Sequence, residues 1–141
     1  MKNMKRVYLS IPIIANRNLE IAKIIAEIIE NEGYEIISKW VLEEDLKINT
    51  SPKDILKRDI ESVLKSDMLI AEVSNPSHGV GMEVAIAFLS GKKIILIKNK
   101  NSKISYMLQG IPDKEIIEYT SKEDIKEKLS EKLKILKKIN K

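Results

Sequence analysis

The chain has 141 residues, of which 33% are charged, with a formal net charge of +4 and a pI of about 9.1. This length predicts a single domain, spanning residues 1–141, with a hydrophobic core of its own. The absence of cysteine excludes disulfides, thiolate zinc sites and cysteine nucleophiles, and favours a reducing, cytoplasmic location. No apolar run reaches the length of a membrane span, and the lysines accompany neither aromatic residues nor a nucleic-acid-binding motif. We therefore expect neither a membrane nor a nucleic acid as a partner.

The chain begins with a strand pattern, a helix pattern and a second strand pattern. Residues 6–11 (RVYLSI) predict the first strand. Asn16 or Asn18 is expected to cap the following helix, which Gly33 ends. Residues 34–41 (YEIISKWV) predict the second strand.

The next helix has a clear start signal. Ser51 is a capping residue, Pro52 suits the first turn, and an acid follows three residues after the cap. The pattern predicts a helix as far as about Lys65. Helical spacing predicts that its buried stripe contains Ile55, Leu56, Ile60 and Val63.

Three further strand-helix units follow. Residues 67–73 (DMLIAEV) are almost continuously apolar, as in a strand that is covered on both faces. The last helix is expected to start at Thr120 or Ser121. The remaining predicted elements are a helix at 79–89, a strand at 92–98, a short helix within 102–108 and a strand at 114–119.

Five repeats of strand and helix predict an α/β fold, a doubly wound, flavodoxin- or Rossmann-like parallel sheet with helices on both faces. The expected strand order is 2-1-3-4-5. Ligands of such sheets bind beyond the carboxyl ends of the strands where the order reverses, here between strands one and three. The loops at 10–18 and 74–81 are therefore expected to form the site.

Two carboxylates fall within apolar patterns. Asp59 lies inside the predicted buried stripe of its helix, between Ile55 and Val63 on a helical wheel. Glu83 lies near the start of the predicted 79–89 helix, surrounded by apolar residues. Asp59 is either a structural acid, paired with Arg58, Arg6 or a backbone amide, or a site residue. Glu83 either benefits from the helix dipole or performs chemistry, because a buried carboxylate is costly without partners.

Other residues near the predicted site allow two interpretations. Gly79 and Gly81 frame a helix start that Ser77 precedes, which suits anion binding but also an ordinary turn. Tyr8 near the end of the first strand is either a core residue or a site residue. With one histidine and no cysteine, we expect no metal site, and no pattern indicates an organic cofactor.

The segment AEVSNPSHGVGMEVAIA resembles the nucleoside 2-deoxyribosyltransferase superfamily, and most closely its 2′-deoxynucleoside 5′-phosphate N-hydrolases, which carry a similar AEV-x-x-PS-x-GVG-x-E run. ISYMLQG, residues 104–110, is also similar to those hydrolases. The resemblance implies that Glu83 is the nucleophile, that Asp59 assists it, and that Tyr8 lies near the sugar. It implies no metal or organic cofactor.

The resemblance also implies residues that bind the substrate. Ser77 matches a phosphate-binding serine, where the transferases have an aspartate. Ser105 matches a serine that reaches the phosphate from a neighbouring subunit, which implies a homodimer with shared sites. Met107, close by, and Gly79 and Gly81 are also expected to contact the substrate.

The segment after the first strand departs from the hydrolase pattern. The hydrolases have a glycine-serine segment and an arginine that binds phosphate, whereas this chain has SIPII, with Pro12 where the serine aligns. We expect Ser10 and Pro12 to contact the substrate and Asn16 or Arg17 to replace the arginine. Trp40, near the position of a histidine in the family, either stacks on the base or sugar or caps the core.

The sequence therefore predicts a hydrolase that cleaves the N-glycosidic bond of nucleoside 5′-monophosphates through a carboxylate nucleophile. Two alternatives remain open. In a transferase, a second base takes the place of water. A nucleotide sensor would use the same fold without catalysis.

Overall fold

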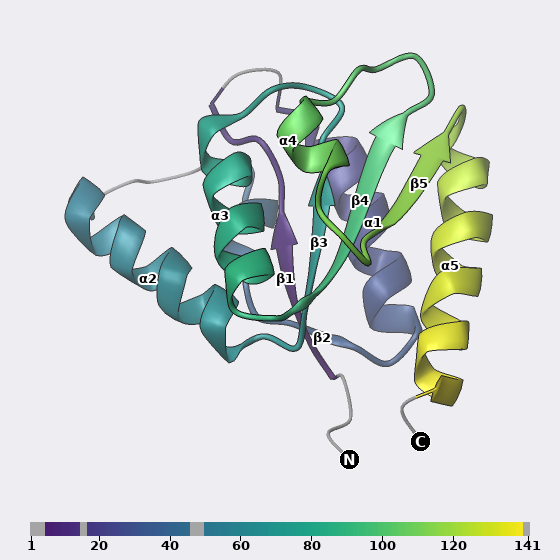
Figure 1. The fold of residues 1–141 in the computed structure, drawn as a ribbon, viewed down its shortest axis with the longest axis horizontal. Coiled ribbons are helices and arrows are strands. Elements are labelled where there is room, and N and C mark those ends of the chain that lie inside the picture. The colour runs from purple at the N-terminus through teal and green to yellow at the C-terminus, as the bar shows by residue number, and fades with distance from the viewer. Residues whose placement is uncertain (1–4, 15–16, 46–49, 140–141) are drawn as a thin grey trace.

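Five parallel strands form one sheet in the computed structural model, which describes residues 5–14, 17–45 and 50–139 (Figure 1). Their order is β2-β1-β3-β4-β5, as the strand-helix alternation predicted. The strands are β1 (Arg6–Ser10), β2 (Glu35–Ile36), β3 (Met68–Glu72), β4 (Lys93–Asn99) and β5 (Glu115–Tyr119).

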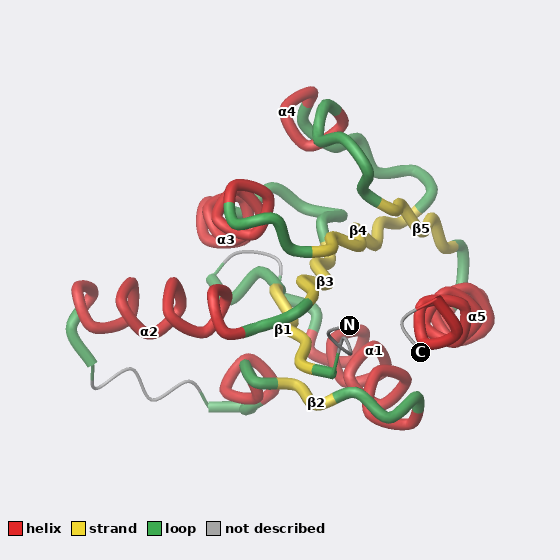
Figure 2. The backbone as a smooth tube through the Cα atoms, turned by 60° about the horizontal axis from the view of Figure 1, so that its bottom comes forward, coloured by secondary structure: helices red, strands yellow, loops and turns green. Residues whose placement is uncertain are grey.

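Helices cover both faces of the sheet, as predicted (Figure 2). One face carries α1 and α5, and the other carries α2 and α3, with the short α4 beyond β4 and β5. The helices are α1 (Leu19–Asn31), α2 (Pro52–Lys65), α3 (His78–Leu89), α4 (Tyr106–Gln109) and α5 (Lys122–Ile139), and a 3-10 helix, η1, spans Lys39–Leu42. Within the described ranges, no helix is both long and apolar enough to span a bilayer.

The alternation of side chains along β1 divides its residues between two cores. Val7 and Leu9 face the core under α1 and α5, whereas Tyr8 lies in the core under α2 and α3. Ser10, two residues after Tyr8, points to the same side of the sheet as Tyr8. Because β1 is central, both Tyr8 and Ser10 are fully buried.

Helix starts follow the predicted caps. The side chain of Asn18 accepts a hydrogen bond from the amide of Ile21 at 3.1 Å, and Ser51 accepts one from Asp54 at 3.2 Å. Ser121 accepts one from Asp124 at 3.1 Å. Asn16, the other candidate cap for α1, lies outside the described residues.

The predicted second strand, 34–41, was too long. The last residue of β2 that pairs with β1 is Ile36, and the amide of Ile37 makes one more hydrogen bond, to the carbonyl of Val7. The 3-10 helix η1 follows. The reason is the side chain of Ser38. Its hydroxyl accepts from the amide of Leu9 at 2.8 Å and donates to the carbonyl of Leu9 at 2.9 Å. Both backbone groups of Leu9 that a longer β2 would use are therefore occupied by a side chain.

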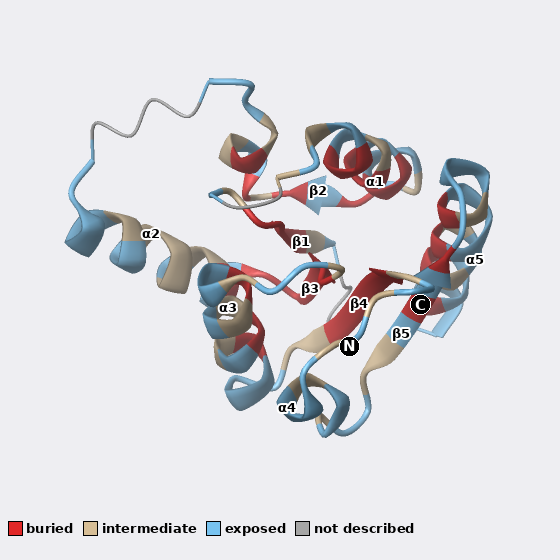
Figure 3. Cartoon of the chain, turned by 90° about the horizontal axis from the view of Figure 1, so that it is seen from above, coloured by how far each residue is buried: buried red, intermediate tan, exposed pale blue. Residues whose placement is uncertain are grey.

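Helix α2 buries less than its pattern predicted. Of its residues only Val63 is buried, while Leu56 is 46% exposed and Leu64 is 48% exposed. Figures 2 and 3 show the cause: α2 contacts the sheet near its C-terminal end and projects away from it, so that most of its surface is intermediate or exposed. The apolar residues of α2 recur at helical spacing as predicted, but among the described residues only Val63 is buried by the rest of the chain.

Candidate active site

Glu83 lies at the centre of a hydrogen-bonded cluster at the carboxyl end of β1. Its Oε2 accepts a hydrogen bond from the hydroxyl of Tyr8, and its Oε1 accepts one from the hydroxyl of Ser10 at 2.6 Å. The central strand β1 supplies both hydroxyls from the same side of the sheet, and α3 supplies the carboxylate. Each carboxylate oxygen of Glu83 is thus held by one hydroxyl donor.

The environment of Glu83 changes its ionisation. Burial is the largest cause that raises its pKa, the hydrogen bonds from Ser10 and Tyr8 lower it, and the nearby negative charge of Asp59 raises it. Together they bring the pKa from 4.5 to about 7. Near neutral pH the side chain therefore exchanges a proton readily while its two oxygens stay in place. Carboxylates with a raised pKa are common at functional sites, so Glu83 is the candidate for the chemistry of this site.

Tyr8 acts as a hydrogen-bond donor rather than an acid. Burial, and then the negative charge of Glu83, raise the pKa of its phenol well above the ordinary value of 10. The phenol consequently keeps its proton at any pH at which the protein works, and its hydroxyl can orient Glu83.

Asp59 lies beside Glu83 and is ion-paired within its own helix. Its Oδ1 accepts from Nε of Arg58 at 2.9 Å, and its side chain is 19% exposed. The pairing with an arginine confirms the structural interpretation of Asp59, while its influence on the pKa of Glu83 leaves a role in the site as a prediction. The structure therefore brings together Tyr8, Ser10, Asp59 and Glu83.

Trp40 forms a wall of this cluster from η1, not from the end of a strand as the sequence predicted. Its ring meets the ring of Tyr8 edge-on, with centroids 6.2 Å apart at 70°. The guanidinium carbon of Arg58 lies 4.1 Å from the centroid of the Trp40 ring on a face of the indole. Arg58, which the sequence offered as a partner of Asp59, thus also contacts Trp40, and no sequence pattern indicated that second contact.

The start of α3 is open to an anion. Ser77 caps the helix by accepting from the amide of Val80 at 3.3 Å, and the amides of His78 and Gly79 have no partner among the described residues. A Cβ atom at Gly79 or Gly81 would meet nothing within 4 Å, and neither residue has a positive φ. Local geometry therefore does not require glycine at either position, which leaves room for a ligand to approach the backbone.

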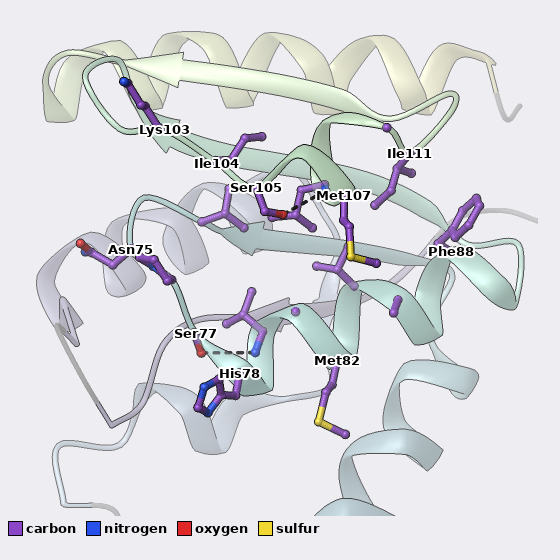
Figure 4. Close-up of a pocket in the computed structure, with 18 residues that line it drawn as sticks. Asn75, Ser77, His78, Met82, Phe88, Lys103, Ile104, Ser105, Met107 and Ile111 are labelled. Atoms are coloured by element: carbon purple, nitrogen blue, oxygen red, sulfur yellow. Dashed lines mark hydrogen bonds between the residues drawn. The ribbon is translucent and has the colours of Figure 1, made fainter.

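A groove of about 760 Å³ lies between α3 and α4 and is distinct from the Glu83 cluster (Figure 4). Ser77, Ser105 and Met107 line it, whereas Glu83 does not. Gly81 and Ala85 face the groove, and Glu83 lies roughly 180° around α3 from them. Ser105 caps α4 by accepting from the amide of Leu108 at 3.2 Å. Within one chain, α3 therefore stands between Ser105 and Glu83.

In the segment after β1, Arg17 does not point its guanidinium to a free phosphate site but bonds to the backbone. Arg17 donates from Nη2 to the carbonyl oxygens of Val41, at 3.0 Å, and Glu43. This arginine therefore fixes the end of η1. Pro12 is buried, and Asn16 lies outside the described residues.

The described residues contain no cluster of three or more His, Cys, Asp or Glu that could hold a metal ion.

The loop from β3 to α3 is fixed by a second buried carboxylate, Glu72. It accepts from the hydroxyl of Tyr119 at 2.6 Å and from the amide and hydroxyl of Ser74 at 2.6 and 2.9 Å. The Ser74 hydroxyl also accepts from the amide of Asn99 at 2.7 Å. Strands β4 and β5 thereby hold the loop that leads to Ser77.

Known proteins resemble this chain both in sequence and in fold. Residues 7–130 match the family model described as nucleoside 2-deoxyribosyltransferase. A relative from Thermofilum pendens, named 2′-deoxynucleoside 5′-phosphate N-hydrolase 1, is 32% identical over 135 residues, which cover 91% of this chain and 94% of the relative. The chain belongs to the nucleoside 2-deoxyribosyltransferase family. A second family relative with the same name, from Methanosarcina mazei, is 34% identical over 129 residues, covering 87% of this chain and 80% of the relative.

Solved structures agree with this assignment at the level of the fold. A CMP N-glycosidase from Clostridium botulinum superposes with a TM-score of 0.74 at 23% identity, covering 91% of this chain and 99% of the other. A 2-deoxyribosyltransferase from Bacillus psychrosaccharolyticus superposes with a TM-score of 0.63 at 16% identity, covering 86% and 90%. The nucleoside 2-deoxyribosyltransferase fold is thus the doubly wound sheet that the sequence predicted.

The raised pKa of Glu83 predicts a pH-dependent effect on stability. The folded chain binds this proton with a pKa of about 7, against 4.5 for an ordinary glutamate, so rising pH between these values favours the unfolded chain. Glu83→Gln removes the titration. Its free energy of unfolding relative to the wild type should rise with pH, by up to about 3 kcal/mol from about pH 4.5 to about pH 8.

Urea unfolding at both pH values measures this difference. Exposed Glu127 on α5 provides the control, because Glu127→Gln should show no such pH dependence. An equal effect of Glu83→Gln at both pH values would contradict the burial of an ionisable Glu83.

Proposed function

We propose that this protein hydrolyses the N-glycosidic bond of nucleoside or 2′-deoxynucleoside 5′-monophosphates, releasing the base and the sugar 5-phosphate. The observation that carries the proposal is the partly buried Glu83 carboxylate, held by Tyr8 and Ser10 beside Asp59. The names of the relatives, including a 5-hydroxymethyl-dUMP N-hydrolase from Esox lucius, support the same reaction. The lack of cysteine suits a reducing, cytoplasmic setting.

Cleavage of this bond develops positive charge on C1′ of the sugar. In the proposed mechanism, ionised Glu83 attacks C1′ as the base departs and forms a glycosyl-enzyme, which water then hydrolyses. Tyr8 and Ser10 hold the two carboxylate oxygens in position and lower the cost of ionising Glu83. No step requires a metal or organic cofactor.

The 5′-phosphate is proposed to bind at the start of α3. Its charge matches the helix dipole, the unpartnered amides of His78 and Gly79, and the hydroxyl of Ser77. The open space over Gly79, which lies on nearly the same side of α3 as Glu83, allows close approach to the backbone. Arg17 is already bonded to backbone carbonyls. The proposed phosphate site therefore uses the donors at the start of α3 and not an arginine from the loop after β1.

The first test of the function is base release from a panel of nucleoside monophosphates. The wild type should release free base, and Glu83→Gln should lose at least about a hundredfold in turnover, because it removes the nucleophile. Glu127→Gln on α5 should retain full activity. Adding a second, acceptor base distinguishes hydrolysis from transfer, since a transferase would form a new nucleoside. If the protein binds monophosphates but releases no base, the sensor alternative is correct.

Ser77→Asp tests the phosphate site. Aspartate caps helices as well as serine does, so α3 should keep its start while the site gains a negative charge. The wild type should hydrolyse monophosphates faster than the matching nucleosides, and Ser77→Asp should narrow or reverse that ratio of kcat/KM. A wild type that shows equal rates on both substrate classes would refute phosphate recognition.

The unpartnered surfaces of α2, α3 and α4 support a homodimer. Leu89 on α3 is 81% exposed, and Tyr106 and Met107 on α4 are 89% and 87% exposed. In the apolar stripe of α2, only Val63 is buried, and Leu56 is 46% exposed. Since α3 separates Ser105 from Glu83 of the same chain, we propose that Ser105 serves the site of a second chain. A twofold interface would use the same patch twice and complete both sites.

Mixing two inactive variants tests this shared site. Glu83→Gln and Ser105→Asp should each be inactive alone, and Asp keeps the α4 cap. Co-expression places both changes in one site of each mixed dimer and leaves the other intact, restoring about a quarter of wild-type activity for random pairing. Sedimentation as a monomer, or no rescue by verified mixed dimers, would rule out the shared arrangement.

A further inference from the structure

Arg58 is held in one orientation by two different contacts. Its Nε donates to Asp59 Oδ1 at 2.9 Å, and its guanidinium carbon lies 4.1 Å from the centroid of the Trp40 ring. The ion pair fixes one edge of the planar group, and the indole supports its face. The orientation of the guanidinium is therefore set before any ligand binds.

This guanidinium belongs to the same wall as the catalytic cluster. Trp40 meets Tyr8 edge-on, Tyr8 donates to Glu83, and Asp59 lies beside Glu83. The charge of Arg58 also acts on the phenol of Tyr8. The Nη groups of Arg58 have no hydrogen-bond partner among the described residues, and the side chain is 40% exposed. Two charged donors are thus available in the wall that Trp40 and Asp59 form beside the cluster.

We propose that Arg58 stabilises the departing base, an inference that rests on the proposed hydrolysis. When the C1′–N bond breaks, both of its electrons go to the base, and its ring nitrogens and carbonyl oxygens carry negative charge. The Nη groups of Arg58 donate hydrogen bonds to such an atom. This is electrostatic stabilisation by groups that are oriented in advance.

The proton balance follows from the chemistry of the two groups. A guanidinium does not release its proton near neutral pH, so Arg58 stabilises the base anion without protonating it. Water supplies the hydroxyl that frees C1′ from Glu83 and the proton that the base finally takes up. Asp59, paired with Arg58, acts as a positioning residue for the guanidinium.

The acidity of the leaving base provides the test. Two 2′-deoxynucleoside 5′-monophosphates are compared, one with uracil and one with 5-fluorouracil, whose anion is more stable. Arg58→Met should slow release of uracil by about a hundredfold and release of 5-fluorouracil by far less, because the second base needs less assistance. Arg58→Lys keeps the charge but loses the planar donors, and its loss should be intermediate. Lys57→Met, which removes an exposed charge from the same helix, is the matched control and should behave as the wild type.

The outcomes separate the two proposals. Thermal unfolding first verifies that Arg58→Met and Arg58→Lys are folded. If both variants then lose equal activity on the two substrates, or if neither loses activity, the role of Arg58 is overturned and the proposed hydrolysis still stands. A wild type that releases neither base, nor any base from other monophosphates, would overturn both. A steeper dependence of kcat on leaving-base acidity in Arg58→Met than in the wild type would support the assignment.

Discussion

The burial of the Glu83 carboxylate next to Asp59 is the constraint on which the rest of the site depends. Two neighbouring acids in a poorly hydrated position repel each other and lose solvation, which destabilises the folded chain. The sheet offsets this cost locally, because Tyr8 and Ser10 from β1 each donate to one oxygen of Glu83. The alternation of side chains along a central strand places both donors on the side that faces α3.

Much of this arrangement could be predicted from the sequence, for identifiable reasons. Strand-helix alternation determines a parallel sheet and its switch point, and Asp59 and Glu83 stand out because acids are rare within apolar stripes. Family resemblance then assigned them roles. These features depend on patterns that repeat along the chain or on residue types that are unusual in their surroundings.

The features that could not be predicted depend on single contacts between distant segments. The end of β2 depends on the Ser38 hydroxyl, which occupies the backbone groups of Leu9. Arg17 bonds to carbonyls near η1 instead of remaining free for a ligand, and Arg58 stacks on Trp40. A serine, or an arginine in a lysine-rich chain, has no local signal that reveals its partner. Helix α2 presents the opposite case. Its apolar pattern is visible in the sequence, but the pattern does not say which surface packs against it.

The hydrogen bonds that join Glu72 and Ser74 to β4 and β5 have a consequence for how the site forms during synthesis. The site residues Tyr8, Asp59 and Glu83 all precede β4 in the chain, yet the loop that enters α3 is held by groups from β4 and β5. A nascent chain that has emerged only through α3 contains every catalytic side chain but lacks the hydroxyl of Tyr119 and the amide of Asn99. Glu72 in such a fragment has lost a partner, so the start of α3 lacks its anchor. A ribosome-bound chain should thus remain without an ordered site until β5 has left the exit tunnel, however early its catalytic residues are made.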